Sequence, residues 1–166
     1  MNMPAKSSHP GPLAAMRVLE LAQIMAGPTC CALLADLGAD VIKVEKVGGG
    51  DDSRGYREPR VNGVSAPFMM LNRNKRGIAL DLKHQQGRAI LLRMVRDADV
   101  LVENFRRGTL EKLGLAYDVL AQANPALIYC AITGFGRDGP LADRGGFDLV
   151  AQGFAGLRAL PGEPGI

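Results

Sequence analysis

The chain has 166 residues, of which 47% are hydrophobic and 22% are charged, and its net charge at neutral pH is +3. This length fits one domain, and the composition is ordinary for a globular protein. The mild positive charge suits an anionic small ligand. The sequence has no RNA-recognition signature, no zinc finger and no basic stripe with interleaved aromatic residues, so we expect no nucleic-acid partner.

The cysteines and the N-terminal residues indicate the cellular compartment of the protein. The three cysteines, Cys30, Cys31 and Cys130, have neither Cys-x-x-Cys nor Cys/His ligand spacing, which argues against a disulfide framework and a metal site. No apolar stretch reaches the roughly 18 residues that would span a membrane. Residues 1–12 lack the apolar core of a secretory signal. We expect a cytoplasmic protein with reduced thiols and a disordered tail over residues 1–12.

The spacing of apolar residues predicts strands and helices in alternation. Apolar, β-compatible runs predict strands over residues 17–21, 40–45, 77–82, 99–103 and 127–132. Helical spacing predicts helices between the first two strands, ending at Gly38, and over residues 84–98, 117–123 and 148–157, with a helical turn over 108–114 and a linker or turn over 161–165. This alternation predicts an α/β fold with a Rossmann-like, doubly wound parallel sheet. Residues 48–63 form the longest predicted irregular segment, and such a loop is functional or disordered.

The loop over residues 22–27 follows the first strand, where an α/β sheet meets its ligand. It contains one glycine, Gly27, and therefore lacks the G-x-G-x-x-G of a dinucleotide site. Pro28 removes a further backbone donor from a pyrophosphate cradle. Although Glu45 stands where a nicotinamide-binding fold keeps its ribose carboxylate, the sequence argues against NAD.

Polar and aromatic residues follow the predicted strands. Gln23, Met25 and Ala26 follow the first strand, Lys46 the second, Lys83 the third, and Asn104 and Phe105 the fourth. If the strands are parallel, these residues gather at one edge, where lysines and backbone donors suit phosphates and the aromatic face suits a flat ring. Solvation of each lysine is the simpler interpretation. The cations over residues 72–77 are likewise either solvated or lining an anion path.

Six ordered blocks resemble the class III coenzyme A-transferases, the group that contains formyl-CoA transferase and carnitine CoA-transferase. They are RVLELAQIMAGPTC, LGADVIKVEKVGGGDDSRGY, LNRNKRGIALDLK, ADVLVENFRRGTLEKLGL, NPALIYCAITGFGRDGP and GFDLVAQG. The resemblance implies that residues 13–166 form a Rossmann-like CoA-binding domain and that the substrates are an acyl-CoA and a carboxylic acid. It also implies that the full-length protein moves coenzyme A between the two and forms an intertwined homodimer.

The resemblance further implies which residues contact coenzyme A. Carried over position by position, Met25 and Ala26 contact it from the first loop, and Lys46 lies near the nucleotide phosphates. The adenine, ribose and phosphate positions are filled by Leu80, Asp81, Leu82, Lys83, Asn104, Phe105 and Lys112, and Gln23 joins the set from its place at the same edge. Lysine in place of arginine at Lys46 and Lys112 loses bidentate phosphate geometry.

The family's aspartate nucleophile is expected downstream of GFDLVAQG and beyond Ile166, so no catalytic residue is assigned in this chain. We expect the chain to be the N-terminal part of an incomplete domain, inactive when isolated. The α-methylacyl-CoA racemases, a sister group, use the His of a G-H-D motif as base, whereas this chain has Gly146-Phe147-Asp148, which favours the transferase. A non-catalytic CoA-binding module is the remaining alternative.

Overall fold

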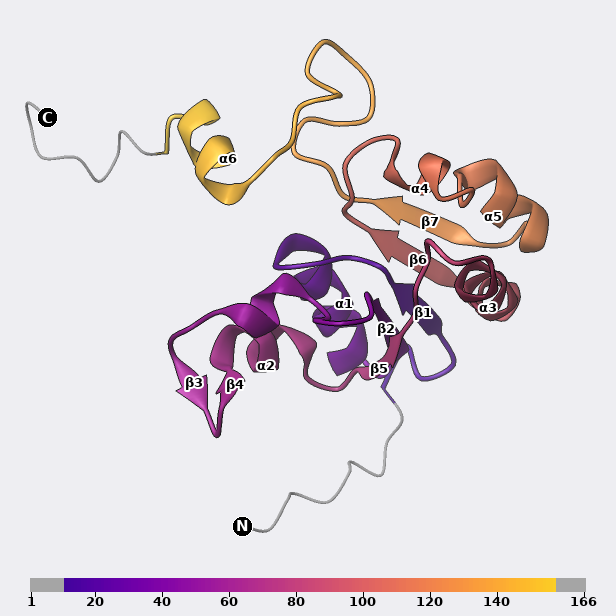
Figure 1. Ribbon diagram of the computed structural model, residues 1–166, viewed down its shortest axis with the longest axis horizontal. Coiled ribbons are helices and arrows are strands. Elements are labelled where there is room, and N and C mark those ends of the chain that lie inside the picture. Colours follow the sequence, from indigo (N-terminus) through magenta and orange to yellow (C-terminus); the bar gives the residue numbers. More distant parts are fainter. Residues whose placement is uncertain (1–10, 158–166) are drawn as a thin grey trace, which may run out of the picture.

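The computed structural model describes residues 11–157 and contains a five-stranded parallel sheet in the order β5-β2-β1-β6-β7 (Figure 1). The sheet strands are β1 (Arg17–Glu20), β2 (Asp40–Glu45), β5 (Arg76–Ala79), β6 (Val100–Glu103) and β7 (Ile128–Ala131). The helices that alternate with them are α1 (Ala26–Asp36), α3 (Gln85–Arg96), α4 (Thr109–Lys112) and α5 (Tyr117–Ala123), and α6 (Asp148–Phe154) follows β7. The predicted doubly wound α/β fold is confirmed. The turn predicted at 161–165 and nearly all of the predicted tail lie outside the described residues.

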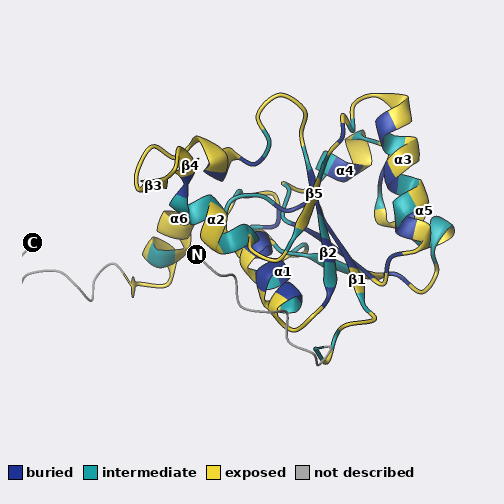
Figure 2. Cartoon of the chain, turned by 90° about the horizontal axis from the view of Figure 1, so that it is seen from below, coloured by how far each residue is buried: buried dark blue, intermediate teal, exposed yellow. Residues whose placement is uncertain are grey.

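Alternating strand residues build a core on each face of the sheet. Val18 packs with Cys31 and Ala35 of α1 on one face. Leu19 packs with α3 and α5 on the other face. Figure 1 shows α1 and α2 on one side of the sheet and α3 and α5 on the other, and Figure 2 shows the buried residues gathered along the strands and the helix sides that face them. Both faces of the central strands β1 and β6 are therefore covered, as a parallel sheet requires.

The segment between β2 and β5 is more ordered than predicted. It holds a 3₁₀ helix, η1 (Asp52–Gly55), a hairpin of β3 (Arg60–Val61) and β4 (Val64–Ser65), and α2 (Ala66–Asn72). Positive φ angles at Asn62 and Gly63 form the hairpin turn, for which an Asn-Gly pair is a known signal. Ser65 caps α2 by accepting the Phe68 N–H at 3.4 Å. Within the segment predicted to be irregular, residues 48–63, only η1 and the two-residue β3 are regular, whereas β4 and α2 lie beyond it and were not predicted.

Several predicted ends shift by a few residues. The strand predicted at 77–82 runs from Arg76 to Ala79, and the helix predicted at 84–98 begins after His84, whose Nδ1 accepts the Gln86 N–H at 3.3 Å. The continuous apolar run at 127–132 predicted a strand covered on both faces. Instead, β7 is at the edge of the sheet, and Ile128 is 59% exposed.

Candidate functional site

The carboxyl ends of the parallel strands lie at one edge, and the loops that follow β1 and β6 are joined there. Asn104 Oδ1 accepts the Gln23 N–H, and Asn104 Nδ2 donates to the Gln23 carbonyl, both at 2.8 Å. Two residues predicted from separate strand ends are thus brought into direct contact. Because both polar atoms of the Asn104 amide are engaged, this side chain fixes the course of the first loop.

The first loop is tightly constrained between Gln23 and Gly27. Ile24 has a φ of +68°, and its N–H lies 3.2 Å from each carboxylate oxygen of Asp51. A Cβ atom at Gly27 would overlap the Ala22 side chain, so only glycine fits there. Met25 and Ala26 are exposed at the tip of this loop, where a ligand can reach them.

The other predicted contact residues are spread along the same edge. Leu80 is buried and belongs to the core, and Leu82 and Phe105 pack against that core. Asp81 accepts the Lys83 N–H at 2.9 Å in the turn before α3. Lys46 is exposed and paired with Asp52 at 2.5 Å. Lys83, in the turn before α3, and Lys112, in α4, are also exposed. Within residues 11–157, no hydrogen bond or ion pair joins Lys83 or Lys112 to the Gln23–Asn104 pair.

A buried cluster of four charges, which the sequence did not reveal, lies beneath the first loop. Lys43 Nζ is 2.7 Å from Glu20 Oε1 and 2.9 Å from Asp51 Oδ2, and it donates to the Ala22 carbonyl at 2.9 Å. Lys75 Nζ is 2.7 Å from Glu20 Oε2, an ion pair without hydrogen-bond geometry. We call Glu20, Lys43, Asp51 and Lys75 the buried charge cluster. Two cations balance two anions in it.

Lys75 corrects the interpretation of residues 72–77 as solvated or lining an anion path. Its side chain is only 2% exposed, and its Nζ also donates to the Pro28 carbonyl at 2.8 Å. The arginines on either side of it remain at the surface, Arg73 paired with Asp36 and Arg76 with Asp40. The sequence shows three cations in one run, but only the three-dimensional structure shows that the middle one, Lys75, is buried.

Burial and pairing shift the pKa values of this cluster in a consistent way. Burial alone would raise the pKa of Asp51, but hydrogen bonds from Lys43 and Ser53 outweigh it and hold that pKa below its usual value. Burial lowers the pKa of Lys75, and Glu20 opposes that change. Burial, followed by the Glu20 charge, raises the pKa of the Cys31 thiol well above its usual value, so this cysteine stays protonated.

Glu45 is occupied within the protein. Its two carboxylate oxygens accept from Arg54 Nε and Nη2, each at 2.7 Å, and Oε2 also accepts the Asp51 N–H at 2.8 Å. Burial would raise the pKa of Glu45, but these bonds hold it below its usual value. The carboxylate that would bind a ribose in a nicotinamide site is therefore already engaged by Arg54 and by the Asp51 N–H.

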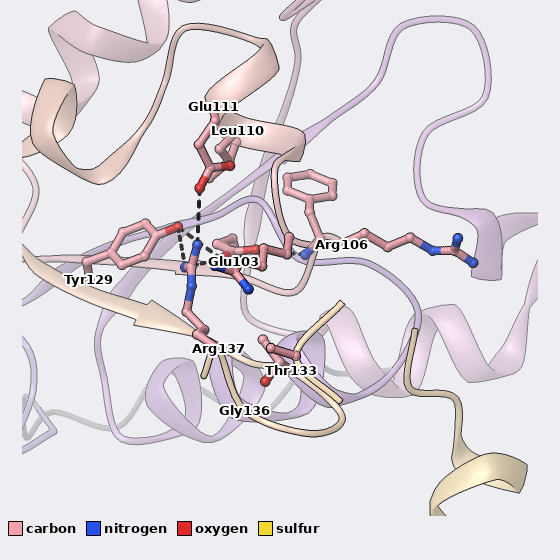
Figure 3. A pocket seen from close by; sticks show the side chains of 11 residues that line it. Glu103, Arg106, Leu110, Glu111, Tyr129, Thr133, Gly136 and Arg137 are labelled. Carbon is pink, nitrogen blue, oxygen red and sulfur yellow. Dashed lines mark hydrogen bonds and ion pairs between the residues drawn. The ribbon is translucent and has the colours of Figure 1, made fainter. Parts of the chain in front are cut away.

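A second polar group lines a small hollow beyond β6 (Figure 3). Tyr129 Oη donates to Glu103 Oε1 at 2.9 Å, and Arg137 Nη1 donates to the same oxygen at 3.3 Å. Arg137 Nη2 reaches Glu111 of α4 at 3.3 Å. Burial raises the pKa of Tyr129 to about 12, so its phenol stays protonated and keeps donating. This group ties the loop after β7 to the ends of β6 and α4.

Two further properties concern the described residues only. Between residues 11 and 157, no three His, Cys, Asp or Glu side chains are grouped so as to hold a metal ion. No helix in that range combines the length and the apolar character that crossing a bilayer requires.

Comparison with known proteins identifies the family. The sequence profile of CoA-transferase family III matches residues 13–166. A succinate–glutarate CoA-transferase of Agrobacterium fabrum is 49% identical to this chain, in a match that covers 92% of this chain and 40% of the relative. An acetyl-CoA:oxalate CoA-transferase of Acetobacter aceti is 45% identical, in a match that covers 97% of this chain and 41% of the relative. The chain thus spans about two fifths of the length of these relatives. A solved CAIB/BAIF family protein of Brucella suis matches with a TM-score of 0.89 and 47% identity over 95% of this chain and 43% of that one. The chain belongs to CoA-transferase family III.

Proposed function

We propose that the complete protein transfers coenzyme A from an acyl-CoA to a carboxylic acid. In this exchange the thioester of the donor breaks, the donor acyl group leaves as a carboxylate, and the acceptor gains the thioester. Membership of CoA-transferase family III carries the proposal, and the names of the relatives, which mention succinate, glutarate and oxalate, make dicarboxylates the first acids to test. We assign no catalytic residue to this segment.

The role of residues 11–157 in this proposal is to bind and orient coenzyme A at the carboxyl edge of the sheet. Met25 and Ala26 are exposed at the tip of a loop whose backbone is held by hydrogen bonds. The exposed ammonium groups of Lys46, Lys83 and Lys112 supply positive charge for the phosphates. Lys46 gives up its Asp52 partner to do so, at little cost, because exposed ion pairs contribute at most about 1 kcal/mol.

The alternatives differ in what they require of particular residues. A racemase of the sister group needs a proton-accepting side chain where this chain has Phe147, which is 59% exposed and has no group that can take a proton. A non-catalytic module would bind coenzyme A without turnover. We also propose a cytoplasmic setting for the complete protein, from its cysteine usage, and an intertwined homodimer, from the family resemblance.

The test uses the complete gene product with succinyl-CoA and isotope-labelled glutarate, followed by chromatography with mass detection. We expect labelled glutaryl-CoA and free succinate to appear in equal amounts. Exchange of an α-proton of a branched acyl-CoA with D₂O, without transfer, would instead favour the racemase. Binding of coenzyme A without either reaction would leave the non-catalytic module and refute the proposed activity.

A matched pair of variants tests where coenzyme A binds. Lys112→Gln removes a cation from the predicted phosphate edge, and Arg96→Gln removes one from the last turn of α3, which leads back to the opposite edge. We expect the first change alone to raise the dissociation constant for coenzyme A, by about threefold to tenfold. Equal effects of the two changes would contradict binding at the carboxyl edge.

A further inference from the structure

The buried charge cluster joins four segments that are distant in the sequence. Glu20 comes from β1, Lys43 from β2, Asp51 from the turn before η1, and Lys75 from the segment between α2 and β5. All four side chains are at most 3% exposed. Buried ion pairs are seldom more stabilising than apolar side chains of the same size, so stability alone does not account for the cluster.

The cluster touches the first loop at two backbone groups on either side of Gln23. Lys43 Nζ donates to the Ala22 carbonyl at 2.9 Å, and Asp51 accepts the Ile24 N–H on both oxygens at 3.2 Å. Asp51 is itself fixed by the N–H of Ser53 at 2.9 Å and its hydroxyl at 2.7 Å. The loop is thus held from below by the cluster, while Asn104 holds it from the neighbouring strand end.

The backbone that Asp51 holds is strained. Ile24 has a φ of +68°, in the left-handed region, which is unfavourable for a β-branched residue. Such conformations persist only where the surroundings impose them, and they concentrate at functional sites. Ile24 comes directly before Met25 and Ala26, the exposed residues at the tip of the loop. Its conformation therefore decides how that tip is presented.

We propose that Asp51 is a positioning residue for coenzyme A: through the buried charge cluster it holds Ile24 in the left-handed conformation and so presents Met25 and Ala26 in their binding shape. The inference rests on the proposed function of the loop as part of the coenzyme A site. A pre-formed loop spares the ligand the cost of ordering it, and a protein that populates the binding shape only in part binds proportionately more weakly. Asp51 touches no reacting atom in this role.

The test compares Asp51→Asn with Asp40→Asn in the complete gene product. Asparagine at position 51 keeps the size of the side chain but loses the charge that pairs with Lys43. The control changes the aspartate at the start of β2, which pairs with Arg76 at the opposite edge of the sheet. Coenzyme A binding is measured by calorimetry, and the kcat and KM for acyl-CoA by steady-state kinetics. We expect Asp51→Asn to raise the dissociation constant and KM about tenfold while kcat changes by less than about threefold, and Asp40→Asn to change none of them.

A rescue experiment separates positioning from a general loss of stability. Glycine adopts a positive φ without strain, so Ile24→Gly added to Asp51→Asn is expected to recover most of the lost affinity. If Asp51 only stabilised the domain, the second change would recover nothing, and the inference would be wrong. The inference is equally overturned if Asp51→Asn, still folded by circular dichroism, binds coenzyme A as the unsubstituted protein does.

A milder variant covers the case in which Asp51→Asn does not fold. Ser53→Ala removes one donor that fixes the Asp51 carboxylate and is expected to weaken coenzyme A binding about threefold. Unchanged binding by that variant would overturn the inference in this case. Failure of the unsubstituted protein to bind coenzyme A at all would refute the proposed function itself, a result distinct from each of the others.

Discussion

Replacing Lys75 by methionine removes one cation from the buried charge cluster and leaves Glu20 and Asp51 to share Lys43. Lys75 Nζ is 2.7 Å from Glu20 Oε2, with the two side chains 2% and 0% exposed, so water cannot replace the lost charge. Removing one partner of a buried pair costs about 3–5 kcal/mol. With a slope of about 2 kcal/mol per molar urea, the unfolding midpoint should fall by about 1.5–2.5 M.

The double-mutant cycle with Glu20→Gln gives the decisive comparison. In the double variant, the positive Lys43 still balances the negative Asp51. It should therefore lose clearly less stability than the sum of the losses of the two single variants. Arg76→Met is the exposed control, since Arg76 is 65% exposed in its pair with Asp40, and it should cost no more than about 1 kcal/mol. Urea unfolding of the complete gene product, followed by circular dichroism, measures all four. Additive losses, or a Lys75→Met loss as small as that of the control, would refute the electrostatic account.

Three further predictions concern the loop, the thiols and acid stability. Gly27→Ala should weaken coenzyme A binding and destabilise the protein by about 1–3 kcal/mol, because the new Cβ would overlap the Ala22 side chain. Gly153→Ala is the control and should not destabilise the protein, because its Cβ would lie in open space. Calorimetry measures coenzyme A binding, and thermal unfolding measures stability. Cys31 should resist Ellman's reagent in the native protein, because burial raises the pKa of its thiol, and rapid labelling at this position would contradict the described packing. Asp51 and Glu45 have folded pKa values below their unfolded ones, so their stabilisation is complete above the unfolded values and is lost as pH falls through the folded values. The unfolding midpoint should therefore stay level from about pH 7 to 5 and fall below about pH 4, with a shallower fall in Glu45→Gln.

The fold could be predicted from sequence wherever an element was long enough to show a period. The apolar runs of β2 and β6 and the stripe of α3 predicted the doubly wound sheet. The β3–β4 hairpin has strands of only two residues, and α2 is apolar from Ala66 to Leu71 without a polar face, so neither shows a period. The Asn62-Gly63 turn and the Ser65 cap were the available signals for this region, and they are local rather than periodic.

The candidate site could be predicted only in part. Strand-end reasoning brought Gln23 and Asn104 to one edge, and the structure joins them, although the contacts with coenzyme A remain predictions. Lys43, inside β2, was not singled out, and Lys75 was interpreted as solvated or lining an anion path, because a charged residue in or beside a strand is usually solvated. Their partners, Glu20 and Asp51, come from other segments, and only the three-dimensional fold shows that all four charges are covered.

The sheet order has a consequence for how the molecule assembles as it is synthesised. β1 meets β2 across a separation of 23 residues but is tied to the start of β6 across 82, so closing the second pair loses more chain entropy. β1, α1, β2 and β5 can therefore associate while β6 is still on the ribosome. The hydrogen bonds from Asn104 to Gln23 can form only after β6 has paired with β1. The first loop therefore reaches its final conformation late, when the β6–β7 part of the sheet joins the part formed by β1, β2 and β5.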